Sequence, residues 1–235
     1  MLSQSHLYGG GLHAHIVDAV GSRIAQGELP PGTILSTELL ERDHGVSRSV
    51  VREVLRTLTG LGMVKPRHRV GTTVLDLSSW KLLDPQVILW RSGGPDSRRQ
   101  LDELLTLREA LEPLAARQTA AGDDGSVGEQ MNLHLNRMRA AFNDGKTGEF
   151  ATADAAFHEA LLRGAHNDAL SQLVQTLLAA LHARYTSHQS FSDDTASSLD
   201  RHQDLVDAVT AGDAEAAEAI SRALVRAAHI EVLGQ

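Results

Sequence analysis

Cysteine is absent from the 235-residue chain, and its absence removes several classes of chemistry. Without thiols the chain has no disulfides, no thiolate metal ligands and no cysteine nucleophile. A chain without cysteine also suits the reducing cytoplasm, where we expect this protein to act. Aromatic residues make up only 3% of the sequence, so any core must be built mainly from Leu, Val, Ile and Ala.

Long apolar runs are also missing. No stretch approaches the ~18 uninterrupted apolar residues of a membrane-spanning helix, so we expect no membrane span. The first 17 residues lack the basic segment followed by an apolar one that is typical of a secretory signal. The hydrophobic content of 42% nevertheless predicts a folded protein, and the length is sufficient for two modest domains.

The formal charge of −8 is unevenly distributed. Residues 1–75 contain 8 Lys or Arg and 6 Asp or Glu, a net charge of +2. Residues 76–235 contain 14 Lys or Arg and 24 Asp or Glu, a net charge of −10. Six cations and one anion, Glu53, lie within residues 46–69. A small basic surface on an acidic protein is typical of a single module that contacts nucleic-acid phosphates. A solvated helix face would give the same pattern, so charge alone does not decide.

The first 75 residues predict three helices followed by a β-hairpin. Apolar residues recur at helical spacing in 12–26, a second short helix starts at Ser36 or Thr37 and ends at Gly45, and Ser47 caps a third. Two β-branched segments around a basic turn then predict a hairpin, the wing. This order is that of a winged helix-turn-helix, whose third helix enters the DNA major groove.

Arginines of the third helix recur every four residues, at Arg48, Arg52 and Arg56, so they share the face away from the core. Arg48 and Arg52 can each donate two hydrogen bonds to guanine O6 and N7, which makes them candidates for base reading. Arg56, Arg67 and Arg69 are expected to contact phosphates; surface arginines are the alternative. The predicted DNA-binding residues are Ser47, Arg48, Ser49, Arg52, Arg56, Arg67, Arg69 and Gly71.

Beyond the wing the sequence predicts only helices. A linker at 77–96 contains a short apolar helix with Trp80 and Trp90 as docking anchors. Six helices follow, at 97–121, 125–143, 147–164, 167–189, 194–211 and 213–233. The predicted fold class is therefore mainly α, with a winged helix-turn-helix in residues 1–76 and an antiparallel all-helical bundle in residues 97–235 that binds an effector and dimerises.

A polar pair interrupts the apolar stripe of the third bundle helix. Asp154 and His158 lie four residues apart, so their side chains share one helical face, and His202 lies beside apolar positions of a later helix. A carboxylate and imidazoles in this arrangement can hold one divalent cation. An Asp-x-x-x-His pair taken alone is more often a surface pair or a hydrogen-bonded interior histidine.

Several motifs together resemble the GntR superfamily of bacterial repressors, in its FadR branch with an FCD effector domain. The N-terminal resemblance runs from Ile24 to Val74, and with the later motifs it spans most of the chain. The later motifs are LDELLTLREALEPLAARQTA, ADAAFHEALLRGAHN, RHQDLVDAV and GDAEAAEA. The linker segment SWKLLDPQVILW is similar to a sub-branch that responds to sugar acids such as galactonate or gluconate.

The resemblance implies a homodimer that binds a palindromic DNA operator and is controlled by a small organic or sugar acid. In the family the acid is often held on a metal bound by one Asp and three His, and the first three ligands fall on Asp154, His158 and His202. The fourth position is Leu224, so this chain departs from the pattern. Three possibilities follow: a three-ligand site completed by water and effector, a shifted ligand, or direct effector binding without metal. Such a site accepts zinc, nickel or manganese.

Arg108 matches a family arginine that points into the cavity and pairs with an effector carboxylate. The predicted effector-binding residues are therefore Arg108, Asp154, His158 and His202. The alternative is a surface arginine beside Glu109 and Glu112.

The expected function is thus a transcriptional regulator, most simply an effector-controlled repressor. A metal-responsive regulator is the second hypothesis. A third is a metal-dependent hydrolase or lyase that uses the Asp/His/His cluster, but it leaves the winged module unexplained.

Overall fold

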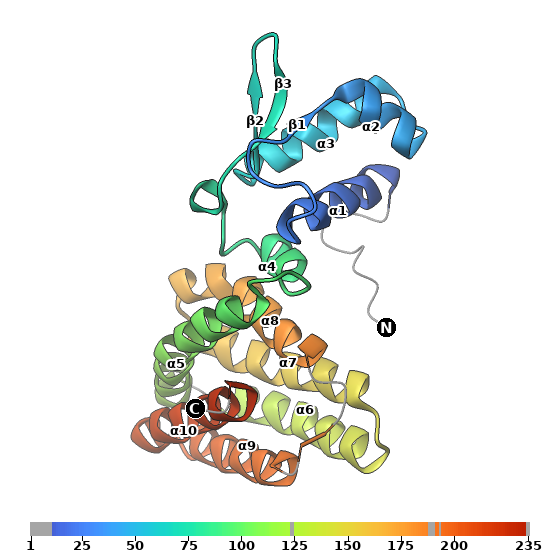
Figure 1. The fold of residues 1–235 in the computed structure, drawn as a ribbon. Helices are drawn as coiled ribbons and strands as arrows, with labels where there is room; N and C mark the ends of the chain where they lie inside the picture. The colour runs from blue at the N-terminus through green and yellow to red at the C-terminus, as the bar shows by residue number, and fades with distance from the viewer. Residues whose placement is uncertain (1–10, 123–124, 188–190, 193, 234–235) are drawn as a thin grey trace. The chain divides into compact units, whose positions relative to one another are not determined.

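The computed structural model describes residues 11–122, 125–187, 191–192 and 194–233, and the chain divides into two compact units, the first ending at Ser97 and the second starting at Arg98 (Figure 1). Helices dominate both units, and the strands described form one small sheet. The predicted fold class, a winged helix-turn-helix followed by a helical bundle, is confirmed. No helix of the described residues is both long and apolar enough to cross a membrane.

The first unit has the predicted order of helices and hairpin. Its elements are α1 (Leu12–Ala25), β1 (Ile34–Leu35), α2 (Thr37–His44), α3 (Arg48–Gly60), β2 (Val64–Arg67), β3 (Gly71–Val74), the 3-10 turn η1 (Leu77–Ser79) and α4 (Pro85–Arg91).

The ends of α2 follow the sequence prediction, whereas the start of α3 follows it only in part. The Ser36 hydroxyl accepts the Leu39 N–H at 3.4 Å, and Gly45 ends α2 in the left-handed conformation with φ 64°. Ser47 does hold the position before α3, but its hydroxyl makes no capping bond and lies 2.9 Å from the Ser49 hydroxyl. The predicted side-chain cap of α3 is therefore wrong.

The wing belongs to a three-stranded antiparallel sheet with the order β1-β3-β2. The sequence analysis missed β1, which is only two residues long and pairs with Thr72 and Thr73 of β3. Gly71 pairs with Arg67 at the outer end of the hairpin. Its φ of 115° favours glycine, and a Cβ at this position would lie 3.0 Å from Ile34 Cγ2. Gly71 thus has a conformational role in the wing, independent of any contact with DNA.

The core of the first unit includes the predicted linker helix. Val51, Val54 and Leu58 of α3 are completely buried in one apolar cluster, to which Trp90 of α4 also belongs. The Trp90 ring packs so closely on α1 that a Cβ on Gly21 would lie 2.5 Å from the ring. The Nε1 atom of Trp90 donates a hydrogen bond to Asp18 at 3.2 Å. Trp80 packs against the same cluster, so both tryptophans act as anchors as expected.

The second unit is a bundle of long helices. They are α5 (Ser97–Gly122), α6 (Ser126–Asn143), α7 (Thr147–Gly164), α8 (Asp168–Ser187), α9 (Thr195–Thr210) and α10 (Ala214–Leu233). Helix α6 packs on α7 and α9, α7 on α8, and α9 on α10 (Figure 1). These helices confirm the six predicted ones; residues 188–189, predicted to end the fourth, lie outside the described residues.

Helices α5 and α10 are joined by ion pairs. Arg117 Nη1 lies 3.1 Å from Glu218 Oε2. Nearer the start of α5, the His229 ring bridges two carboxylates, with Nδ1 2.6 Å from Glu109 and Nε2 2.8 Å from Asp102. An imidazole has two N–H donors only when it is protonated, so this bridge requires the charged histidine.

The His229 bridge predicts a pH-dependent contribution to stability. Burial lowers the pKa of His229, but hydrogen bonds to Glu109 and Asp102 outweigh burial and raise the pKa above its ordinary value. A raised folded-state pKa gives stabilisation that is complete below the unfolded value of about 6.5 and is lost as pH rises through the folded-state pKa. His229→Gln should therefore lower the free energy of unfolding by about 1 kcal/mol near pH 5.5, and by less near pH 9.

Urea unfolding of the full chain at the two pH values measures this difference. His166→Asn is a matched control, because His166 is exposed and its φ of 47° is one that asparagine tolerates. An equal loss at both pH values in His229→Gln would contradict the bridge.

Candidate functional site

The predicted DNA-binding residues belong to α3, the residue before it and the wing, all in the first unit. All eight are exposed: Ser47, Arg48, Ser49, Arg52, Arg56, Arg67, Arg69 and Gly71. The α3 arginines lie opposite the buried stripe of that helix, as the four-residue spacing predicts. Their ion pairs are exposed and weak, with Arg48 3.6 Å from Glu38 and Arg56 3.0 Å from Glu53. Such pairs can readily be exchanged for contacts with phosphate.

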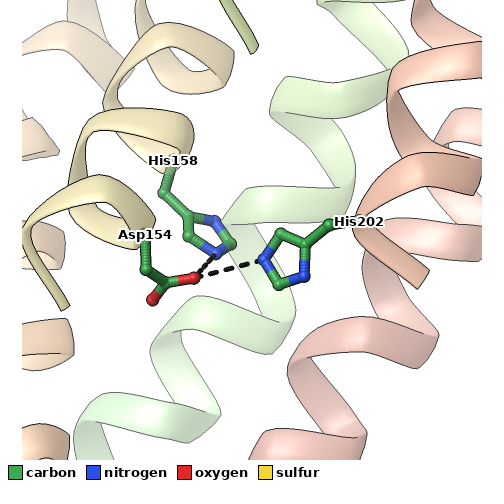
Figure 2. Close-up of side chains that lie close together, drawn as sticks. All are labelled: Asp154, His158 and His202. Atoms are coloured by element: carbon green, nitrogen blue, oxygen red, sulfur yellow. Dashed lines mark ion pairs between the residues drawn. The ribbon is translucent and has the colours of Figure 1, made fainter. Parts of the chain in front are cut away.

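The polar cluster predicted in the second unit is buried. Asp154 and His158 come from α7 and His202 from α9, and each is at most 3% exposed. Figure 2 shows both imidazoles directed at the same carboxylate: Asp154 Oδ1 lies 3.7 Å from His158 Nε2 and 3.2 Å from His202 Nε2. One potential ligand atom from each residue lies within 4.8 Å of the others.

The outward-facing atoms of this cluster lie next to polar groups of other residues. His202 Nδ1 donates to the Ser198 carbonyl at 2.6 Å, and His158 Nδ1 lies 2.9 Å from Glu112 Oε2. The Tyr185 hydroxyl donates to Asp154 Oδ2 at 3.0 Å, which leaves Oδ1 facing the imidazoles. The Phe157 ring packs edge-on against both histidines. In a neutral histidine protonated at Nδ1, the Nε2 atom is unprotonated and can ligate a metal.

This arrangement fits a divalent cation. Tetrahedral ligands with bonds of ~2.1 Å lie ~3.4 Å apart, close to the two Asp154–imidazole distances. Burial would raise the pKa of Asp154, but the His202 hydrogen bond and the charges of His158, His202 and Arg184 outweigh burial and hold the pKa below its ordinary value. The carboxylate is therefore ionised and ready to ligate. Asp154, His158 and His202 could together bind a metal.

Arg108 is buried rather than on the surface, and it is already paired. Its side chain is 1% exposed, with Nε 2.5 Å from Glu112 Oε1 and Nη2 3.3 Å from Oε2. Burial would raise the pKa of Glu112, but Arg108 and His158 lower it to about 2. Among the described residues, Arg108 Nη1 is buried without a hydrogen-bond partner.

Glu112 and Tyr185 are the members of the site that sequence reasoning missed. The spacing of Arg108 and Glu112 is the same i,i+4 spacing that revealed Asp154 and His158, so Glu112 could have been found. Tyr185 comes from α8, and nothing local marks it. Leu224, at the family's fourth ligand position, is 4% exposed and packs in the apolar core, so it supplies no donor.

Comparisons with known proteins agree with both units. Residues 12–74 match the family described as bacterial regulatory proteins, gntR family, and residues 103–227 match the FCD domain. An uncharacterized HTH-type transcriptional regulator of Escherichia coli K12, YieP, is 33% identical over 212 residues, covering 90% of this chain and 91% of its own. The galactonate operon transcriptional repressor of the same organism is 30% identical over 207 residues, covering 86% and 89%.

A solved structure supports the fold. It is that of Lar, which controls the expression of the Listeria monocytogenes agr system; it matches with a TM-score of 0.67 and 20% identity, covering 94% of this chain and 96% of Lar. The exposed basic helix, the wing and the helical bundle are thus those of a DNA-binding transcriptional regulator rather than an enzyme. The chain belongs to the GntR family of bacterial regulatory proteins and carries an FCD effector domain.

Proposed function

We propose that this regulator is a homodimeric repressor whose affinity for a palindromic operator is controlled by a small carboxylate, such as a sugar acid. The acid binds on a divalent cation held by Asp154, His158 and His202. The observation that carries the proposal is the convergence of two imidazole Nε2 atoms on one buried carboxylate. The galactonate repressor among the relatives supports the sugar-acid class.

The DNA-binding step follows from the exposed arginines. Arg48 and Arg52 read base edges in the major groove, while Arg56, Arg67 and Arg69 bind phosphates. A two-fold dimer presents two such surfaces to the two halves of a palindrome. Because phosphate contacts release counterions, operator affinity falls steeply with salt.

The effector step uses the buried cluster. A bound zinc, nickel or manganese ion would supply positive charge and an open coordination position for an effector oxygen. Leu224 offers no ligand there, so the chain itself leaves the position to water or effector. Arg108 Nη1 offers a buried donor to the same anion. The acid changes operator affinity only by the difference between its affinities for the two states of the bundle.

Substitution of Arg52 tests the DNA-reading surface. Arg52→Ala should weaken binding to an operator selected from random DNA by about 1–3 kcal/mol, because a bidentate base contact is lost without any change to the core. Fluorescence anisotropy at fixed salt measures the affinity. Arg222→Ala, an exposed arginine of α10, should have no effect. Unchanged affinity in Arg52→Ala would refute the assignment.

Substitution of Asp154 tests the metal site. Asp154→Asn should reduce the affinity for Ni²⁺ at least about tenfold, since the amide brings no charge to the cation. Calorimetric titration of chelator-treated protein measures this affinity, with His166→Asn as a control outside the cluster. Equal Ni²⁺ affinity in the wild type and Asp154→Asn would place the metal elsewhere.

Operator affinity measured without any organic acid distinguishes the metal-responsive alternative from the acid-controlled repressor. A repressor controlled by an acid should show the same operator affinity with and without Ni²⁺ until the acid is added. A change of affinity on adding Ni²⁺ alone would make the ion itself the signal.

A further inference from the structure

Glu112 is a buried carboxylate shared by the acid-binding and metal-binding parts of the site. Its Oε2 lies 3.3 Å from Arg108 Nη2 and 2.9 Å from His158 Nδ1, and its side chain is completely buried. It therefore contributes a full negative charge to the site without occupying a position among the inward-facing ligand atoms.

The charges around the site can be added. Asp154 and Glu112 are negative and Arg108 is positive, so together they carry −1. Arg184, which also acts on Asp154, is paired with Glu231 at 2.8 Å, so this pair adds no net charge. Histidines that ligate a metal through Nε2 are neutral. A divalent cation then brings the site to +1.

A buried net charge is costly, so the favoured ligand is the one that cancels it. One carboxylate brings the metal-loaded site to zero, whereas two carboxylates leave it at −1. The guanidinium can take part in this neutralisation, because Glu112 occupies Nε and Nη2 and leaves the N–H groups of Nη1 for the incoming acid.

We propose that Glu112 is a specificity-determining residue that makes the site select monocarboxylates over dicarboxylates. This inference rests on the proposed metal and effector site. It further specifies how many negative charges the accepted acid carries. Removal of the Glu112 charge brings the metal-loaded site to +2, which two carboxylates neutralise.

The test compares acids that differ mainly in one carboxylate: D-gluconate with D-glucarate, and lactate with malate. Calorimetry on Ni²⁺-loaded full-length protein gives the affinity ratio within each pair. The wild type should prefer the monoacid at least about tenfold, and Glu112→Gln should move the ratio at least about tenfold toward the diacid. Glu103→Gln, an exposed carboxylate of the same helix, should leave the ratio unchanged. A ratio unchanged by Glu112→Gln, or a wild type that prefers diacids, would overturn the inference.

A second pair of variants keeps the test valid if Glu112→Gln fails to fold with its arginine unpaired. In an Arg108→Gln background the loaded site has no net charge, and adding Glu112→Gln returns it to +1 without leaving an unpaired guanidinium. Monoacid affinity should therefore rise at least about tenfold from Arg108→Gln to the double variant, and no rise would contradict the charge count.

Failure of the proposed function has a different signature. No Ni²⁺ binding by the wild type refutes the metal site, and Ni²⁺ binding without any response to acids refutes the effector class. Either result also refutes the selectivity inference. If the protein binds acids but its selectivity is the same in the wild type and in Glu112→Gln, only the selectivity inference is refuted.

Discussion

The electrostatic cost of burying charge governs the second unit. Asp154 and Glu112 are ionised inside an apolar bundle, where an uncompensated carboxylate would be strongly destabilising. Arg108 compensates Glu112 directly, whereas Asp154 is paired with two imidazoles and the Tyr185 hydroxyl and, among the ion pairs of the described residues, has no arginine in direct contact. A divalent cation at this point would complete the compensation, and its binding would then stabilise the bundle.

The fold supplies this site with rigid supports. One turn of α7 places Asp154 above His158, α9 brings His202 to the same carboxylate, and the Phe157 ring packs against both imidazoles. The Ser198 carbonyl accepts a hydrogen bond from His202 Nδ1 and Glu112 Oε2 lies 2.9 Å from His158 Nδ1, so the inner ring nitrogens face Asp154. The first unit instead keeps the arginines of α3 and of the wing exposed, as suits contacts with a hydrated DNA surface.

Sequence periodicity predicted the helices and the Asp154–His158 pair, because these depend on neighbours three or four residues away, and two β-branched segments around a turn predicted the wing. The strand β1 was not predicted because two residues are too few to show the alternating pattern of a strand. It is defined only by its pairing with β3. Tyr185 escaped because its partner lies 31 residues away. Composition could not show that Arg108 is buried, since the residues that cover it come from other helices. The outcome for Ser47 shows that a favoured capping residue can hold the position without making the bond.

X-ray absorption spectroscopy of full-length protein loaded with one equivalent of Ni²⁺ tests the central claim most directly. The predicted spectrum contains scattering from two imidazoles together with oxygen ligands, and His202→Gln should remove one imidazole. A nickel shell without imidazole scattering, or one unchanged in His202→Gln, would contradict a metal site at Asp154, His158 and His202.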